Sequence, residues 1–113
     1  MSPITTHVLD TTTGKPASEL SISLQRRNPD GSFTTIAKGI TNEDGRITDL
    51  LKEGELQIGI YKMHFDTDGY LKNNGIDGFY PEAVICFRIE NTKQHYHIPL
   101  LLSPFGYSTY RGS

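Results

Sequence analysis

The chain has 113 residues and a formal net charge of −2 at pH 7, because 13 acidic residues outnumber 11 basic ones. A chain of this length can bury about two-thirds of its unfolded surface, so it can build one core but not two. We therefore expect a single domain over residues 1–113. The charge balance argues against a general nucleic-acid-binding protein, which needs a basic surface to neutralise phosphates.

The apolar segments are short. The longest, residues 98–102, contains Pro99 and is far too short to cross a bilayer. The first residues lack the basic and then apolar pattern of a secretory signal. The one cysteine, Cys86, excludes an internal disulfide framework and is interpreted as a buried strand residue. Together these features favour a cytoplasmic protein.

In chain order, the hydrophobic pattern predicts mostly β-strands. Apolar Leu20, Ile22 and Leu24 alternate with polar neighbours, which is typical of a half-buried strand. The Asn-Pro-Asp-Gly sequence at residues 28–31 predicts a turn to a returning strand. The strands expected in this way are residues 4–9, 20–25, 33–40, 56–65, 84–89, 95–102 and 107–110.

One short helix is expected after the strand that ends near residue 65. Asp66 or Thr67 can cap its N-terminus, Asp68 favours the positive end of the helix dipole, and Gly75 can end it. A helix this short needs a sheet to pack on. With seven or eight strands at regular spacing, the sequence predicts a β-sandwich.

The histidines offer two interpretations. His95 and His97 lie two residues apart in an expected strand, so they point to one face, and His7 lies within the first strand. Three histidines can hold a catalytic zinc ion, whereas the plainer alternative is that each is an ordinary strand histidine. His64, between Met63 and Phe65, is interpreted as structural.

Two further features carry potential chemistry. Arg46 follows an Asp-Gly turn, where its guanidinium could bind a planar anion or could simply be a surface charge. The last segment, residues 107–113, is rich in aromatic and β-branched residues, which predicts a pinned final strand rather than a frayed end. The Gly-x-Ser-x-Gly elbow of serine hydrolases and a glycine-rich phosphate loop are both lacking. From the residues alone, the prediction is a β-sandwich with a His/Arg site.

Several blocks resemble the 5-hydroxyisourate hydrolase family, the transthyretin-related enzymes of purine breakdown. The blocks are residues 6–10 (THVLD), 14–17 (GKPA), 44–46 (DGR), 96–104 (YHIPLLLSP) and 107–113 (YSTYRGS). The resemblance implies a transthyretin-like sandwich of two four-stranded antiparallel sheets, with one short helix after the fifth strand. It also implies a homotetramer, a dimer of dimers with active sites where the dimers meet.

The resemblance also implies the site and the reaction. The catalytic residues carried over are His7, Arg46, His97 and Ser113, and His7, Arg46 and Tyr110 would bind substrate. The reaction implied is hydrolysis of the N1–C6 cyclic amide of 5-hydroxyisourate to 2-oxo-4-hydroxy-4-carboxy-5-ureidoimidazoline in urate degradation. Neither a metal nor an organic cofactor is expected.

The mechanism needs a neutral imidazole to take a proton from water, and positive charge or hydrogen-bond donors for the oxyanion. His7 is the preferred base, although His97 is an open alternative. Two other functions also stay open at this point. One is a transthyretin-like carrier of a small ligand, and the other is a zinc-dependent hydrolase that uses His7, His95 and His97.

Overall fold

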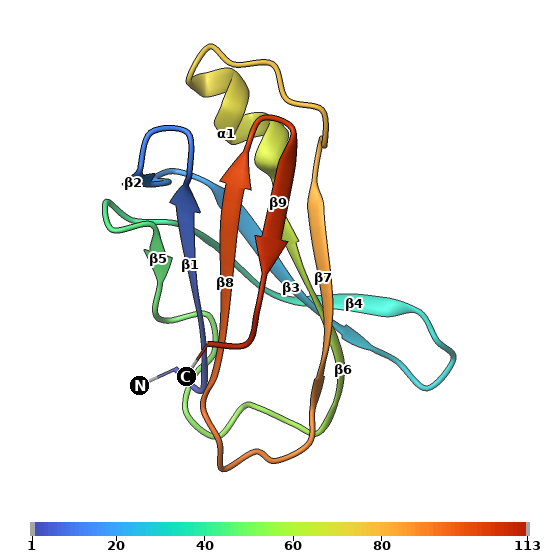
Figure 1. The fold of residues 1–113 in the computed structure, drawn as a ribbon. Helices are drawn as coiled ribbons and strands as arrows, with labels where there is room; N and C mark the ends of the chain where they lie inside the picture. Colours follow the sequence, from blue (N-terminus) through green and yellow to red (C-terminus); the bar gives the residue numbers. More distant parts are fainter. Residues whose placement is uncertain (1, 113) are drawn as a thin grey trace.

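The computed structural model describes residues 2–112. Two β-sheets pack face to face, and one helix lies at an end of the sandwich (Figure 1). In the first sheet the strand order is β2 (Lys15–Pro16), β1 (Ile4–Asp10), β8 (Tyr96–Ser103) and β9 (Gly106–Thr109), and β5 (Arg46–Ile47) also pairs with β1. In the second the order is β4 (Phe33–Ile40), β3 (Ser21–Arg27), β6 (Gly59–Phe65) and β7 (Ala83–Ile89). The expected two-sheet sandwich is thereby confirmed.

Each long inner strand buries alternate residues, as the period-two pattern predicts. In β1 the buried residues are Ile4, Thr6, Val8 and Asp10, while the residues between them are only half-buried. One hydrophobic core forms between the sheets. Its fully buried large apolar side chains are Ile4, Val8, Leu20, Leu24, Tyr61, Met63, Phe65, Leu71, Ile89, Leu100 and Leu102.

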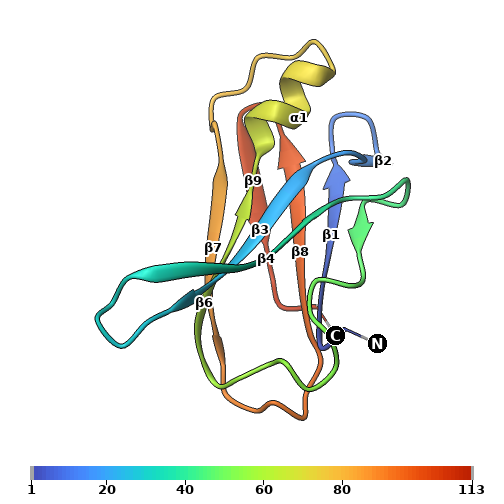
Figure 2. The same cartoon turned by 180° about the vertical axis from the view of Figure 1, so that it is seen from behind.

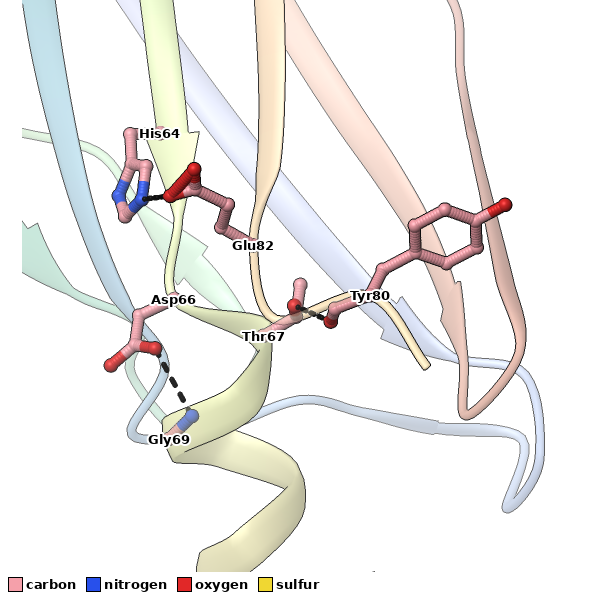
Figure 3. Close-up of polar contacts among 6 residues, drawn as sticks. All are labelled: His64, Asp66, Thr67, Gly69, Tyr80 and Glu82. Carbon is pink, nitrogen blue, oxygen red and sulfur yellow. Dashed lines mark hydrogen bonds and ion pairs between the residues drawn. The ribbon is translucent and has the colours of Figure 1, made fainter. Parts of the chain in front are cut away.

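Helix α1 (Thr67–Asn73) begins as the sequence predicts, because the Asp66 carboxylate accepts a hydrogen bond from the Gly69 amide at 3.1 Å (Figure 3). Gly75 follows the helix with a φ of 71°, a conformation that glycine adopts without strain. The helix packs back on the sheets through Tyr70, whose hydroxyl donates to the buried Asp10 carboxylate at 2.8 Å. A side-chain cap therefore sets the start of α1, and a glycine backbone conformation follows its end.

Three details differ from the expected architecture. β1 and β8 run parallel, so the first sheet is mixed rather than antiparallel. Two strands so far apart in sequence are not joined by a hairpin, and no turn therefore imposes an antiparallel direction. The two-residue strand β2 was not expected, and it makes β6, which precedes the helix, the sixth strand instead of the fifth.

The third difference is that β6 begins at Gly59, whereas the alternation predicts a start at Leu56. Leu56 is buried, but the backbone beside it does not join the ladder. The Tyr61 hydroxyl instead donates to the Gln57 carbonyl at 2.7 Å and accepts from the Gln57 amide at 3.2 Å. A side chain here takes the hydrogen bonds that a neighbouring strand would otherwise supply.

The edges of the two sheets lie on a common side of the sandwich. β7 and β9 are the last strands of their sheets, and both views place them on the same side (Figures 1 and 2). The β3–β4 hairpin projects from the body beyond the other strands (Figure 2). Among the described residues, no helix has the length and apolar character needed to span a bilayer.

Candidate active site

Strand β1 brings the predicted site residues together. His7 is in register with Arg46 on β5, and Thr5 is in register with His97 on β8. Residues in register on neighbouring strands point to the same face of a sheet. Because the alternate residues of β1 face the core, His7, Arg46 and His97 share the outer face of the first sheet. The structure thus assembles three of the predicted site residues within one chain.

The loop that positions Arg46 is locked to β1. The Asn42 side chain accepts hydrogen bonds from the amides of Asp44, at 2.9 Å, and Arg46, at 3.0 Å. Gly45 has a φ of 72°, and a Cβ atom at this position would lie 2.5 Å from the Val8 carbonyl oxygen. The Gly45 carbonyl in turn accepts from the Val8 amide at 2.8 Å. Only glycine allows this close approach, which holds the start of β5 against β1.

His7 is held in its neutral form. Burial lowers the pKa of His7 below its ordinary value of 6.5, and the positive charge of Arg46 lowers it further. A hydrogen bond with the Asp44 backbone and the Asp44 charge oppose this shift without reversing it. His7 is therefore an imidazole able to accept a proton near pH 7.

His97 is also held neutral, through similar causes. Burial lowers the pKa of His97, and the positive charges of Arg46, His7 and His95 lower it further. A hydrogen bond with the Thr5 backbone raises the pKa but does not reverse the shift. Two neutral imidazoles and a fixed cation suit a reaction that needs a base and a site for developing negative charge.

The C-terminal segment packs on His97. The Gly112 amide donates to the His97 carbonyl at 2.9 Å, and a Cβ atom on Gly112 would lie 2.5 Å from the Cδ2 atom of the His97 ring. Arg111 lies over the Tyr96 ring, 4.5 Å from its centroid, and donates to the Gln94 side chain at 3.0 Å. These contacts confirm the expected pinned segment as far as residue 112. Ser113, a predicted catalytic residue, lies outside the described residues.

Tyr110 shares a cavity with one of the other site residues. Its side chain is exposed, and it lines a cavity of about 340 Å³ together with His97, Ile98 and Phe87. Among the described residues that line this cavity, His7 and Arg46 are not present. Its role as a substrate-binding residue stays a prediction.

His64 lies on the other sheet, as its structural interpretation requires. Its Nε2 atom is hydrogen-bonded to the Glu82 carboxylate at 2.8 Å, between β6 and the start of β7, next to the capped end of α1 (Figure 3). Within residues 2–112, no three His, Cys, Asp or Glu side chains are grouped closely enough to hold a metal ion. The set of His7, His95 and His97 is thus not arranged as zinc ligands.

Sequence reasoning missed one polar residue on this face. Thr5 lies two residues before His7, so the period of a strand places it on the same face. Its hydroxyl contacts the rings of both His95 and His97. The alternation in β1 could have identified it, but its partners on β8 depend on a register that no local pattern encodes.

The fold and the polar face define a transthyretin-type β-sandwich with a His/Arg site. The chain belongs to the HIUase/Transthyretin family, whose sequence model matches residues 4–112. It is 45% identical to the 5-hydroxyisourate hydrolase of Mus musculus, over 99% of this chain and 96% of that protein. It is 42% identical to the 5-hydroxyisourate hydrolase of Halalkalibacterium halodurans, over 97% of each chain.

Solved structures agree with the family. A crystal structure of sea bream transthyretin in complex with thyroxine matches with a TM-score of 0.94 and 34% identity, over 98% of this chain and 95% of that chain. The transthyretin fold predicted from the sequence is thereby confirmed. The family includes both 5-hydroxyisourate hydrolases and transthyretins, so the site must carry the argument for the activity.

Proposed function

We propose that this chain is a hydrolase that opens the N1–C6 cyclic amide of 5-hydroxyisourate, giving 2-oxo-4-hydroxy-4-carboxy-5-ureidoimidazoline. The curated relatives named above carry this activity in their names. The observation that carries the proposal is the convergence of His7, Arg46 and His97 on one sheet face, with the pKa of both imidazoles lowered.

In the proposed mechanism His7 is the general base. The neutral His7 ring takes a proton from water as the water oxygen attacks the C6 carbonyl. Arg46 stabilises the negative charge that develops on the carbonyl oxygen, and its guanidinium also orients the planar heterocycle. The C6–N1 bond then breaks, and the proton returns to N1 through His7 or His97. His97 orients the attacking water or relays that proton, which its free ring nitrogen accepts and then passes on.

The C-terminal segment completes the pocket in this proposal. Tyr110 binds the polar edge of the substrate, and Ser113 contributes to catalysis at the same place. The support is that Gly112 lies directly on the His97 ring, which brings the C-terminal segment up to the site as far as residue 112. The polar outer face also argues against a carrier of a large apolar ligand, because His7 and Arg46 would be poorly solvated beneath one.

We also propose a homotetramer, a dimer of dimers, for this chain. The edge strands β7 and β9 lie on one side of the sandwich, and near them Phe79 and Phe105 are 70% and 77% exposed. Exposed strand edges and large apolar side chains are features that a second copy can cover. Sedimentation-velocity centrifugation tests this proposal: we expect a species of four chains, and a stable monomer at micromolar concentration would contradict it.

We also propose that this chain is located in the cytoplasm. Cys86 is free and exposed rather than buried as expected, because its side chain points away from the core on edge strand β7. A free exposed thiol persists best in a reducing compartment. Fractionation of cells that express the chain would test the location.

The decisive experiment is a direct assay of the reaction. Urate is oxidised enzymatically in the cuvette, and the ultraviolet absorbance of the 5-hydroxyisourate formed is followed with and without the protein. We expect the protein to accelerate the decay far beyond the buffer rate. His7→Ala should reduce kcat by about 100-fold or more, since general base catalysis contributes on that scale.

A matched control is His64→Ala, which removes a histidine from the other sheet, and it should leave the rate unchanged. Decay at the buffer rate with folded wild-type protein would disprove the hydrolase function. A His7→Ala variant that turns over normally would remove His7 from the mechanism.

A further inference from the structure

Thr5 bridges two histidines on the outer face of the first sheet. Its Oγ1 atom lies 2.8 Å from Nδ1 of His97 and 3.2 Å from Nε2 of His95. Thr5 and His97 are in register across the parallel pair of β1 and β8. The Thr5 side chain is half-buried while His95 is exposed, so the three groups run from the site to solvent.

A hydroxyl group has a single proton, which limits how these contacts can be satisfied. If the Thr5 hydroxyl donates its proton to His95 Nε2, its oxygen can accept a hydrogen bond from an Nδ1–H group of His97. If it donates to His97 Nδ1 instead, the proton of a neutral His97 ring must lie on Nε2. The first arrangement leaves the Nε2 lone pair of His97 free, whereas the second makes Nε2 a donor.

A second contact favours the first arrangement. The Thr5 backbone also hydrogen-bonds His97 and raises its pKa, which is the effect of a carbonyl oxygen that accepts a ring N–H. A carbonyl cannot donate, so this contact favours a proton on the edge of the ring that meets β1. The Nδ1–H form satisfies this requirement together with the Thr5 hydroxyl.

We propose that Thr5 is a positioning residue for the hydrolysis, whose hydroxyl, backed by His95, fixes the orientation of the His97 ring and keeps its proton on Nδ1. The proposal rests on the proposed function, because it assigns His97 a role in that reaction. Thr5 does not touch the substrate. It acts by presenting His97 with the Nε2 lone pair turned away from β1, ready to orient water or to accept a proton.

The chain offers well-matched variants for a test. Thr5→Val keeps the β-branched shape and removes only the hydroxyl, and Thr5→Ser keeps the hydroxyl and removes only the methyl group. Thr5→Ala removes the hydroxyl with less steric demand, should the valine variant fail to fold. Thr35→Val makes the same change at an exposed position of β4 on the other sheet.

The kinetic readout is the split between kcat and KM on freshly generated 5-hydroxyisourate. We expect Thr5→Val and Thr5→Ala to lower kcat by about 10- to 100-fold, the usual cost of removing the group that orients a functional histidine. KM should change by less than about threefold, because Thr5 makes no substrate contact. Thr5→Ser should recover most of kcat, and Thr35→Val should match the wild type.

The second readout needs no activity. Long-range ¹H–¹⁵N correlation spectra of ¹⁵N-histidine-labelled protein distinguish the two neutral forms of the His97 ring. We expect Nδ1–H in the wild type and in Thr5→Ser. In Thr5→Val only the backbone contact of residue 5 still favours Nδ1–H, so we expect a larger fraction of Nε2–H, the form preferred by free imidazole side chains. If Thr5 only supported the fold, the proton of the His97 ring would stay on the same nitrogen in all these variants.

The two proposals fail in different ways. A wild-type protein that is inactive on 5-hydroxyisourate would overturn the proposed function, while the ring spectra would still decide the role of Thr5. Active wild-type protein with a folded Thr5→Val variant of normal kcat would overturn the Thr5 proposal alone. The Thr5 proposal is also wrong if Thr5→Ser loses as much activity as Thr5→Val. It is equally wrong if the His97 ring of the wild type carries its proton on Nε2.

Discussion

The contact between Gly112 and His97 predicts that one added methyl group at the end of the chain will impair the site. In Gly112→Ala the new Cβ atom would lie 2.5 Å from Cδ2, 3.1 Å from Cγ and 3.2 Å from Cβ of His97. Non-bonded carbon atoms prefer about 3.5–4.0 Å, so the ring and the C-terminal segment must separate by about 1 Å. A displacement of this size at a reacting group costs about 100-fold in rate.

We therefore expect Gly112→Ala to lower kcat for 5-hydroxyisourate by about 100-fold, or about 2.7 kcal/mol of activation free energy. The matched control is Gly106→Ala on the same hairpin, where the added Cβ would have only the Ser103 hydroxyl within 4 Å, at 3.8 Å. That variant should retain wild-type turnover. If Gly112→Ala is folded and keeps kcat within about threefold of the wild type, the inference that His97 needs this packing is wrong.

The remaining predictions concern the buried Tyr70 hydroxyl and the Arg46 charge. Tyr70→Phe removes the hydrogen bond to the buried Asp10 carboxylate. We expect a loss of about 1.5–3 kcal/mol in the free energy of unfolding, measured by urea denaturation at pH 7. A loss below about 0.5 kcal/mol would show that the bond contributes little. Burial raises the pKa of Tyr70 to about 12, so this stabilisation is complete below pH 10 and is lost as the pH rises through 12, where the wild type should approach the variant. Arg46→Gln removes a cation that lowers the pKa of both His7 and His97, and we expect both imidazoles to titrate at higher pH in NMR, whatever the activity of the variant. An unchanged titration of both rings would show that the Arg46 charge does not reach them.

Local patterns in the sequence were sufficient for most of the fold. Alternation in β1, β3 and β8 predicts strands because one face of each meets the core, and Asp66 predicts the start of α1 because its side chain caps the helix. β6 shows the limit of this reasoning. Residues 56–58 alternate in sequence, yet the Tyr61 hydroxyl takes the backbone hydrogen bonds of Gln57, a contact that no periodicity encodes.

Local sequence patterns predict less of the site than of the fold. The spacing of His7, Arg46 and His97 does not indicate that they meet, because their proximity depends on the pairing of β1 with β5 and β8. Only the resemblance to a family brought them together in advance. Thr5 was overlooked for the same reason, since its importance comes from the register with His97. The roles of Tyr110 and Ser113 stay predictions.

The parallel pairing of β1 with β8 has a consequence for the order of events in biosynthesis. Thr6 on β1 hydrogen-bonds Ile98 on β8, a partner 92 residues further along the chain. During translation, one edge of the first strand therefore stays unpaired until residues 96–103 have left the ribosome. Contacts between such distant segments form slowly. The site can therefore form only after β8 has been synthesised, and the return of turnover after dilution from denaturant reports the pairing of β1 with β8.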